Sequence, residues 1–159
     1  MKPSLSLTLF GTAALVALSA GAAAARPVKI TAQMADYGGY PAYVAVYVVD
    51  KSGAYQSTLW VAGHKTRYYS NLRTWSRLTG RSNPRLDGIT GASVGSGRTL
   101  TVNADLSDAL INAGYRIQVD TASEEGPERP AEVSVPLDAA SVGKPFAGRG
   151  TIRRFTVSF

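Results

Sequence analysis

Residues 42–49 read Ala-Tyr-Val-Ala-Val-Tyr-Val-Val, an unbroken apolar run that is rich in Val and Tyr. Pro41 precedes the run and Asp50 follows it. β-Branched and aromatic residues favour strands, and an apolar run without polar alternation is typical of a strand that is covered on both faces. The stretch therefore predicts the central strand of a β-sheet, with the core of the protein built around it.

Six further short strands are expected around this one, because turn residues break the chain at short intervals. Lys-Ser-Gly at 51–53 predicts the turn of a hairpin. In the last strand, alternation places Phe155, Val157 and Phe159 on one face. Short strands at this spacing predict an all-β fold, an antiparallel two-sheet sandwich. The seven expected strands cover residues 28–33, 42–49, 57–62, 98–104, 115–121, 131–137 and 151–159.

One segment of the chain has a helical period. Apolar residues within 65–80 are spaced by three and four, and Gly80 follows them. This spacing predicts one short amphipathic helix of about three turns that crosses one end of the sandwich. Residues 82–97 contain Pro84 and four glycines, and we expect them to form a loop. The expected apolar face of the helix is Tyr68, Leu72, Trp75 and Leu78.

The N-terminal stretch has the pattern of a secretory signal peptide. Lys2 precedes an apolar run at 5–20, and small residues fill 21–25. We expect a signal peptide over 1–25, cleaved after Ala25 or alternatively after Ala24, and a single domain over 26–159. An uncleaved anchor helix is the alternative, but the run is shorter than the ~20 residues that span a bilayer. No later segment is apolar enough to cross a membrane, so a periplasmic or secreted protein is expected.

Composition excludes several classes of site. The 159 residues contain no Cys and one His, which excludes disulfides, thiolate metal sites and a two-His metal motif. A hydrolase triad would have His64 as its only base, and no nucleophile elbow is present, so no enzyme is expected. Acidic residues cluster at 120–132 with a spacing that matches no metal-binding loop. The net charge of +6 favours anionic partners, but we expect no nucleic-acid binding and a monomer.

Residues 87–93 read Asp-Gly-Ile-Thr-Gly-Ala-Ser. This string resembles the acceptor signature of exported proteins that carry covalent FMN. The resemblance implies that a periplasmic FMN transferase joins the FMN phosphate to the last hydroxyl of the string. The acceptor must be an alcohol, which attacks the pyrophosphate of FAD while AMP leaves. An ordinary surface turn, in which the Asp and Thr side chains bond to their own backbone, is the alternative. The candidate cofactor-binding residues are Ser93, Asp87, Thr90, Gly91 and Ala92.

A basic stretch directly precedes this string in the sequence. Six cations fall within 65–86 without an acidic residue among them, and Tyr and Trp are interleaved. One interpretation is an anion site for a flavin phosphate, a lipid head group or an acidic redox partner, because a planar guanidinium can donate hydrogen bonds to two oxygens of one oxyanion. The other is a solvated helix face whose aromatic residues pack on the sandwich. The candidates for binding a phosphate at the loop are Arg81, Arg85 and Arg98.

Several strings resemble one family along most of the chain. They are Tyr-Pro-Ala-Tyr-Val-Ala-Val-Tyr-Val-Val-Asp at 40–50, Thr-Leu-Trp-Val-Ala-Gly at 58–63, Leu-Arg-Thr-Trp at 72–75 and Gly-Tyr-Arg-Ile-Gln-Val at 114–119. Residues 28–137 thereby resemble the bacterial periplasmic domain-of-unknown-function family 2271. This resemblance implies an immunoglobulin-like sandwich, a periplasmic location and no established enzymatic activity. Members accompany PepSY-type membrane reductases and FMN transferases, which implies an interaction module in extracytoplasmic electron transfer or iron handling.

Overall fold

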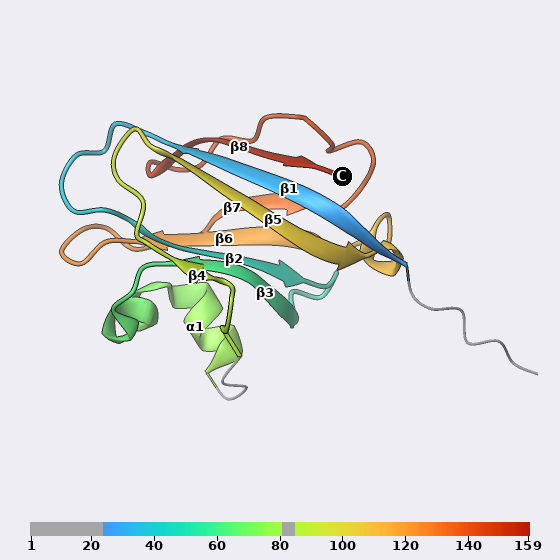
Figure 1. The fold of residues 1–159 in the computed structure, drawn as a ribbon, viewed down its shortest axis with the longest axis horizontal. Coiled ribbons are helices and arrows are strands. Elements are labelled where there is room, and N and C mark those ends of the chain that lie inside the picture. The colour runs from blue at the N-terminus through green and yellow to red at the C-terminus, as the bar shows by residue number, and fades with distance from the viewer. Residues whose placement is uncertain (1–23, 81–84) are drawn as a thin grey trace, which may run out of the picture.

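The structure is a computed structural model that describes residues 24–80 and 85–159 (Figure 1). These residues form two β-sheets packed face to face, with a short helical segment on the outer side of the larger sheet. The expected all-β sandwich with one short α-helix is confirmed. Of the expected signal peptide, residues 1–23 lie outside the described part of the chain.

The two sheets contain three and five strands. The smaller sheet has the order β5 (Thr99–Ser107), β1 (Ala25–Met34), β8 (Ile152–Ser158). The larger sheet has the order β4 (Thr90–Gly91), β3 (Tyr55–Ala62), β2 (Tyr43–Val49), β6 (Arg116–Ala122), β7 (Arg129–Pro136). Neighbouring strands are antiparallel except for β3 and β4, which are parallel.

Strand β2 lies at the centre of the larger sheet, and all seven of its residues are buried. Alternate residues from Val44 to Val48 join the main core between the two sheets. The intervening residues, from Tyr43 to Val49, join a second core beneath the helical segment. The prediction of a central strand covered on both faces is therefore confirmed, and the molecule has a sheet–sheet–helix layering (Figure 1).

The helical segment departs from the single three-turn helix that the sequence predicts. It is split into a 3₁₀-helix, η1 (Thr66–Asn71), and an α-helix, α1 (Arg73–Thr79). Leu72 separates them with a ψ of 74°, which no α-helix accommodates, and its side chain is fully buried in the second core. Packing of Leu72 thus interrupts the helix. Both pieces lie along the outer face of the larger sheet rather than across one end of the sandwich (Figure 1).

The segment at 82–97, expected to be a loop throughout, contains strand β4. Without this segment, the outer edge of β3 would leave backbone N–H groups unpaired. The Val61 N–H donates to the Ile89 carbonyl at 2.9 Å, and the Gly63 N–H donates to the Gly91 carbonyl at 2.7 Å. This pairing is parallel, so the expectation of an entirely antiparallel sandwich is wrong at this edge. All seven expected strands are present, and their observed ends differ from the expected ends by at most three residues.

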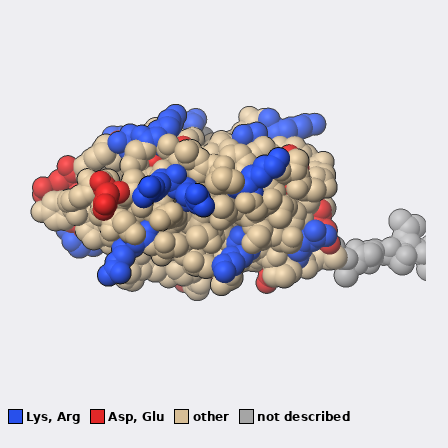
Figure 2. All heavy atoms as spheres, turned by 90° about the horizontal axis from the view of Figure 1, so that it is seen from above, with Lys and Arg blue, Asp and Glu red and all other residues tan. Residues whose placement is uncertain are grey.

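Basic residues are spread over the molecule rather than gathered in one patch on the face shown in Figure 2. That view is from above the smaller sheet of Figure 1, and Lys and Arg side chains are scattered across it between neutral residues. Acidic side chains show mainly toward the two ends of the same face. The positive net charge therefore does not create a continuous cationic surface on this side.

Candidate functional site

The 87–93 loop crosses the open edge of the larger sheet. Gly91 accepts a hydrogen bond from Gly63 after β3, and Val94 exchanges two backbone hydrogen bonds with Ala42, at 2.7 and 2.8 Å. Between these two anchors lie Ala92, which is exposed, and Ser93, which is half-buried. Ser93 is therefore held on a two-residue span at the protein surface. Its hydroxyl makes no hydrogen bond with another residue in the described part of the chain.

Asp87 and Thr90 are both exposed, and Gly88 turns the chain between them with a φ of +75°. Within 24–80 and 85–159, neither side chain makes the bond to its own backbone that an ordinary surface turn would use. The turn is closed instead by Ile89 N–H, which donates to the Leu86 carbonyl at 3.1 Å. The two polar groups of the candidate motif are consequently left open to solvent.

Gly91 has a structural role that is independent of any cofactor. A Cβ atom at this position would lie 2.6 Å from Cζ2 of Trp60, which is closer than real Cβ contacts. The indole of Trp60 belongs to the edge of the main core. The glycine of the motif is thus required for β4 to approach the sheet, and this explains one of the seven residues by packing alone.

A groove of about 350 Å³ lies beside the loop, on the side of the helical segment. His64, Tyr69, Asp87 and Thr90 contribute to its lining. The Tyr69 hydroxyl donates to the Gly63 carbonyl at 2.9 Å, which fixes its ring in place. The structure therefore brings the Asp and Thr of the candidate motif together with the single histidine, a proximity that the sequence did not reveal.

Of the three arginines expected to bind a phosphate at Ser93, the structure describes two. Arg81 lies outside the described residues. Arg85 and Arg98 are exposed, and neither guanidinium forms a hydrogen bond or an ion pair with another described residue. Their role as phosphate ligands at Ser93 stays a prediction.

The basic stretch instead meets the acidic turn between β6 and β7. Lys65 Nζ lies 2.8 Å from Glu124 Oε1, and Arg73 forms an ion pair with Glu128. Arg67 lies over the ring of Tyr68, 4.8 Å from its centroid. Two of the six cations are thus neutralised by carboxylates more than fifty residues away in sequence. Tyr68 and Trp75 pack in the second core, which confirms the structural interpretation for these two aromatic residues.

The Lys65–Glu124 pair gives a titration that can be measured. The hydrogen bond from the Lys65 ammonium lowers the pKa of Glu124 below its usual 4.5. Because the folded-state pKa is the lower one, the pair stabilises the fold above pH 4.5, and this contribution is lost as the pH falls through the folded-state pKa. We expect Lys65→Met to return the Glu124 pKa toward 4.5, as followed by NMR of the carboxyl carbon. Lys51→Met, a control at an exposed lysine in the turn between β2 and β3, should leave it unchanged; equal titration of Glu124 in both variants would contradict the pairing.

Two other carboxylates of the 120–132 cluster are used inside the protein. Asp120 is fully buried and accepts hydrogen bonds from the backbone of α1, from Tyr47 and from Ala131. Glu132 accepts from the backbone of Thr151 and Ile152, at 2.7 and 2.9 Å. The described residues contain no group of three or more His, Asp or Glu side chains arranged to hold a metal ion. The cluster is therefore dispersed into structural hydrogen bonds and ion pairs.

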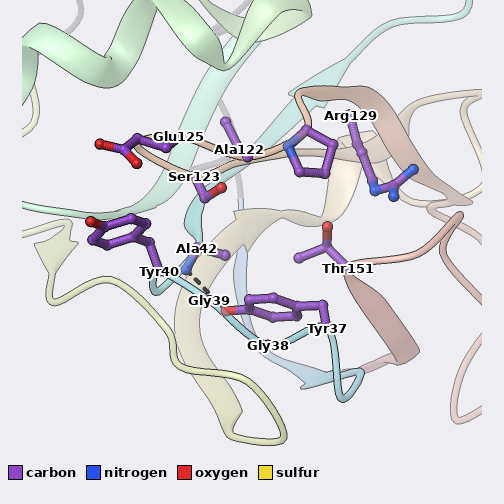
Figure 3. Close-up of a pocket in the computed structure, with 12 residues that line it drawn as sticks. Tyr37, Gly38, Gly39, Tyr40, Ala42, Ala122, Ser123, Glu125, Arg129 and Thr151 are labelled. Atoms are coloured by element: carbon purple, nitrogen blue, oxygen red, sulfur yellow. Dashed lines mark hydrogen bonds between the residues drawn. The ribbon is translucent and has the colours of Figure 1, made fainter.

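A second cavity, of about 380 Å³, opens at the end of the sandwich (Figure 3). It lies between the β1–β2 connection and the β6–β7 turn, and its lining includes Tyr37, Tyr40, Ser123, Glu125, Arg129 and Thr151. None of the sites expected from the sequence includes residues 37–41 or Arg129. The signal that was available is a Tyr-Gly-Gly-Tyr string, in which two aromatic rings flank a flexible backbone.

The protein is a two-sheet β-sandwich, and the loop at the edge of its larger sheet carries the Ser93 hydroxyl, which has no hydrogen-bond partner among the described residues. The family model described as "Predicted periplasmic protein (DUF2271)" matches residues 25–154, and the chain belongs to that family. No curated protein and no solved structure matches it. In the described part of the chain, none of the helices has the length and apolar character needed to span a membrane.

Proposed function

We propose that this periplasmic protein is an interaction module for extracytoplasmic electron transfer and carries FMN esterified to Ser93. The observation that supports the proposal most directly is the placement of Ser93 on a short surface span whose two ends are fixed by backbone hydrogen bonds. Such a residue is accessible to another enzyme, and modification there leaves both cores undisturbed. Bound FMN would supply the capacity to accept and release electrons.

The attachment is a phosphoryl transfer that a separate FMN transferase catalyses with FAD as donor. The Ser93 oxygen forms a bond to the phosphorus next to the riboflavin part of FAD, the bond to the AMP phosphate breaks, and AMP leaves. The hydroxyl proton passes to a base of the transferase. The residues next to the acceptor, Gly91 and Ala92, have little or no side-chain bulk, so the loop fits the active site of another enzyme. In this role the protein itself catalyses no reaction.

The proposal is tested by producing the protein in the periplasm with a working FMN transferase. We expect one FMN per chain, seen as a fluorescent band in a denaturing gel and as the mass of FMN less one water. Ser93→Ala should abolish both signals because no alcohol remains to attack. Ser96→Ala, a serine in the same glycine-rich segment, should leave them intact.

The outcome against the proposal is a wild-type protein that stays unmodified while a known acceptor in the same cells becomes fluorescent. Modification that persists in Ser93→Ala would show that another residue is the acceptor. Asp87→Ala separates recognition from attachment: the acceptor remains, so we expect slower modification with the same final site.

A docking module without a cofactor is the second candidate. The contact of Gly91 with Trp60 favours it, because that contact accounts for the glycine of the motif by packing alone. In this case the expected partner is still a membrane reductase of the PepSY type or an iron-handling protein, bound through the sandwich surface. Wild-type protein that binds this partner yet stays unmodified beside a working transferase would favour this candidate over the first.

A further inference from the structure

The cavity at the end of the sandwich contains an arginine with no partner. Arg129 is half-buried, and its Nε atom is completely shielded from solvent without a hydrogen-bond acceptor. Across residues 24–80 and 85–159, its guanidinium forms no hydrogen bond and no ion pair. A buried donor that has lost water and gained no acceptor costs free energy, and the cost is greater for a charged group. The Nε donor stays unsatisfied inside the protein, and the terminal N–H groups of the same guanidinium, which have no acceptor among the described residues either, are the ones that an acceptor from outside can reach.

The guanidinium is held in place by the backbone beside it. A Cβ atom at Gly150 would lie 2.6 Å from Cζ of Arg129, so the group rests directly on the glycine. The nearby acids do not neutralise it. Glu132 is occupied by the Thr151 and Ile152 amides, and Glu125 is exposed at the far side of the cavity (Figure 3). An oxyanion entering the cavity would thus find a positioned cation without displacing a protein carboxylate.

The remaining walls suit a flat apolar group. The Tyr37 hydroxyl donates to the Val94 carbonyl at 2.5 Å and accepts from Ala42 N–H at 3.0 Å, so its ring has a fixed orientation (Figure 3). Tyr40 is 52% exposed, which makes it the large hydrophobic residue that stands most open to solvent in the described chain. The volume of about 380 Å³ lies in the lower part of the range of ~300–1,000 Å³ for small-molecule sites.

We propose that this cavity binds a small aromatic carboxylate, with the carboxylate on Arg129 and the ring among Tyr37 and Tyr40. A planar carboxylate matches the planar guanidinium fork and can accept two of its N–H groups at once. Tyrosine rings offer faces for an aromatic ring to pack against. Ser93 is not among the residues that line this cavity, and the proposal does not depend on FMN.

The test uses unmodified protein from cells without an FMN transferase, titrated with benzoate and followed by backbone amide NMR. We expect saturable shifts at Gly38, Gly39 and Gly126, which line the cavity. Benzamide, the neutral analogue of the same shape, should bind at least about tenfold more weakly because it lacks the charge. Arg129→Gln should weaken benzoate binding by a similar factor, and Arg153→Gln, an exposed arginine on β8, should not change it.

Three results would each overturn the inference. They are benzoate and benzamide binding equally, shifts confined to residues away from the cavity, and no saturation by about 10 mM benzoate. The benzamide comparison needs no variant, so it decides the matter even if Arg129→Gln fails to fold. Tyr40→Ser adds a second variant at an exposed position, and there we expect weaker binding of both analogues.

Discussion

Replacing Val46 with aspartate is expected to prevent the protein from folding. Val46 is fully buried at the centre of β2, between β3 and β6, and belongs to the core between the two sheets. An ionised carboxylate there has no partner, and the free energy of burying it exceeds the stabilisation that one interaction gives. Because small domains are stable by only ~5–15 kcal/mol, we expect loss of the cooperative thermal transition in circular dichroism.

Two control substitutions distinguish the effect of burying a charge from the effects of adding a charge at the surface or of removing volume from the core. Thr101→Asp introduces the same charge on an exposed position of β5 and should leave the melting temperature nearly unchanged. Val46→Ala removes volume without adding charge and should cost roughly 2 kcal/mol while the protein still folds. A Val46→Asp protein that melts like wild type would show that β2 is not the central strand.

The second large effect is expected at Asp120, where one carboxylate joins three parts of the fold. Its Oδ2 accepts the N–H groups of Thr74 and Trp75 at the start of α1, at 2.6 and 2.9 Å. Its Oδ1 accepts the Tyr47 hydroxyl and Ala131 N–H, at 2.9 and 2.7 Å. In Asp120→Asn the amide NH₂ would face two of these donors. We expect a loss of about 3 kcal/mol or more in the free energy of unfolding, measured by urea denaturation.

The control for this substitution is Asp105→Asn, which makes the same chemical change at an exposed position of β5. It should alter the free energy of unfolding by less than about 0.5 kcal/mol. Tyr47→Phe removes only one of the four donors to Asp120 and should give an intermediate loss. Equal stability of Asp120→Asn and wild type would mean that the carboxylate is not needed to hold α1 on the sheet.

The strands could be predicted from the sequence because their signal is local. The run at 42–49 is apolar at every position and rich in Val and Tyr, and this pattern is typical of a strand that is covered on both faces. Turn residues then mark the ends of the neighbouring strands. The break at Leu72 could not be predicted in the same way. It depends on a pocket in the second core and on Asp120, which lies 48 residues further along the chain.

The candidate site was predictable only in part, for the same reason. The 87–93 string marks a loop, but its attachment to the free edge of β3 depends on backbone groups that carry no sequence signature. The basic run could be interpreted as an anion site when considered alone, and the acidic run matched no metal-binding loop. The pairing of Lys65 with Glu124 shows that they form a contact within the fold, and the unpartnered Arg129 lies outside both expected sites.

The pairing of β1 with β8 sets the time at which this protein can finish folding. Lys29 and Ser158 are opposite each other in the sheet although 129 residues separate them along the chain. During synthesis β1 emerges first, but it lacks one of its two neighbours until nearly the whole chain has been made. Contacts this distant in sequence also form slowly, since the intervening chain must be closed into a loop. For a protein of a periplasmic family, we expect late folding to keep the chain extended while it crosses the membrane.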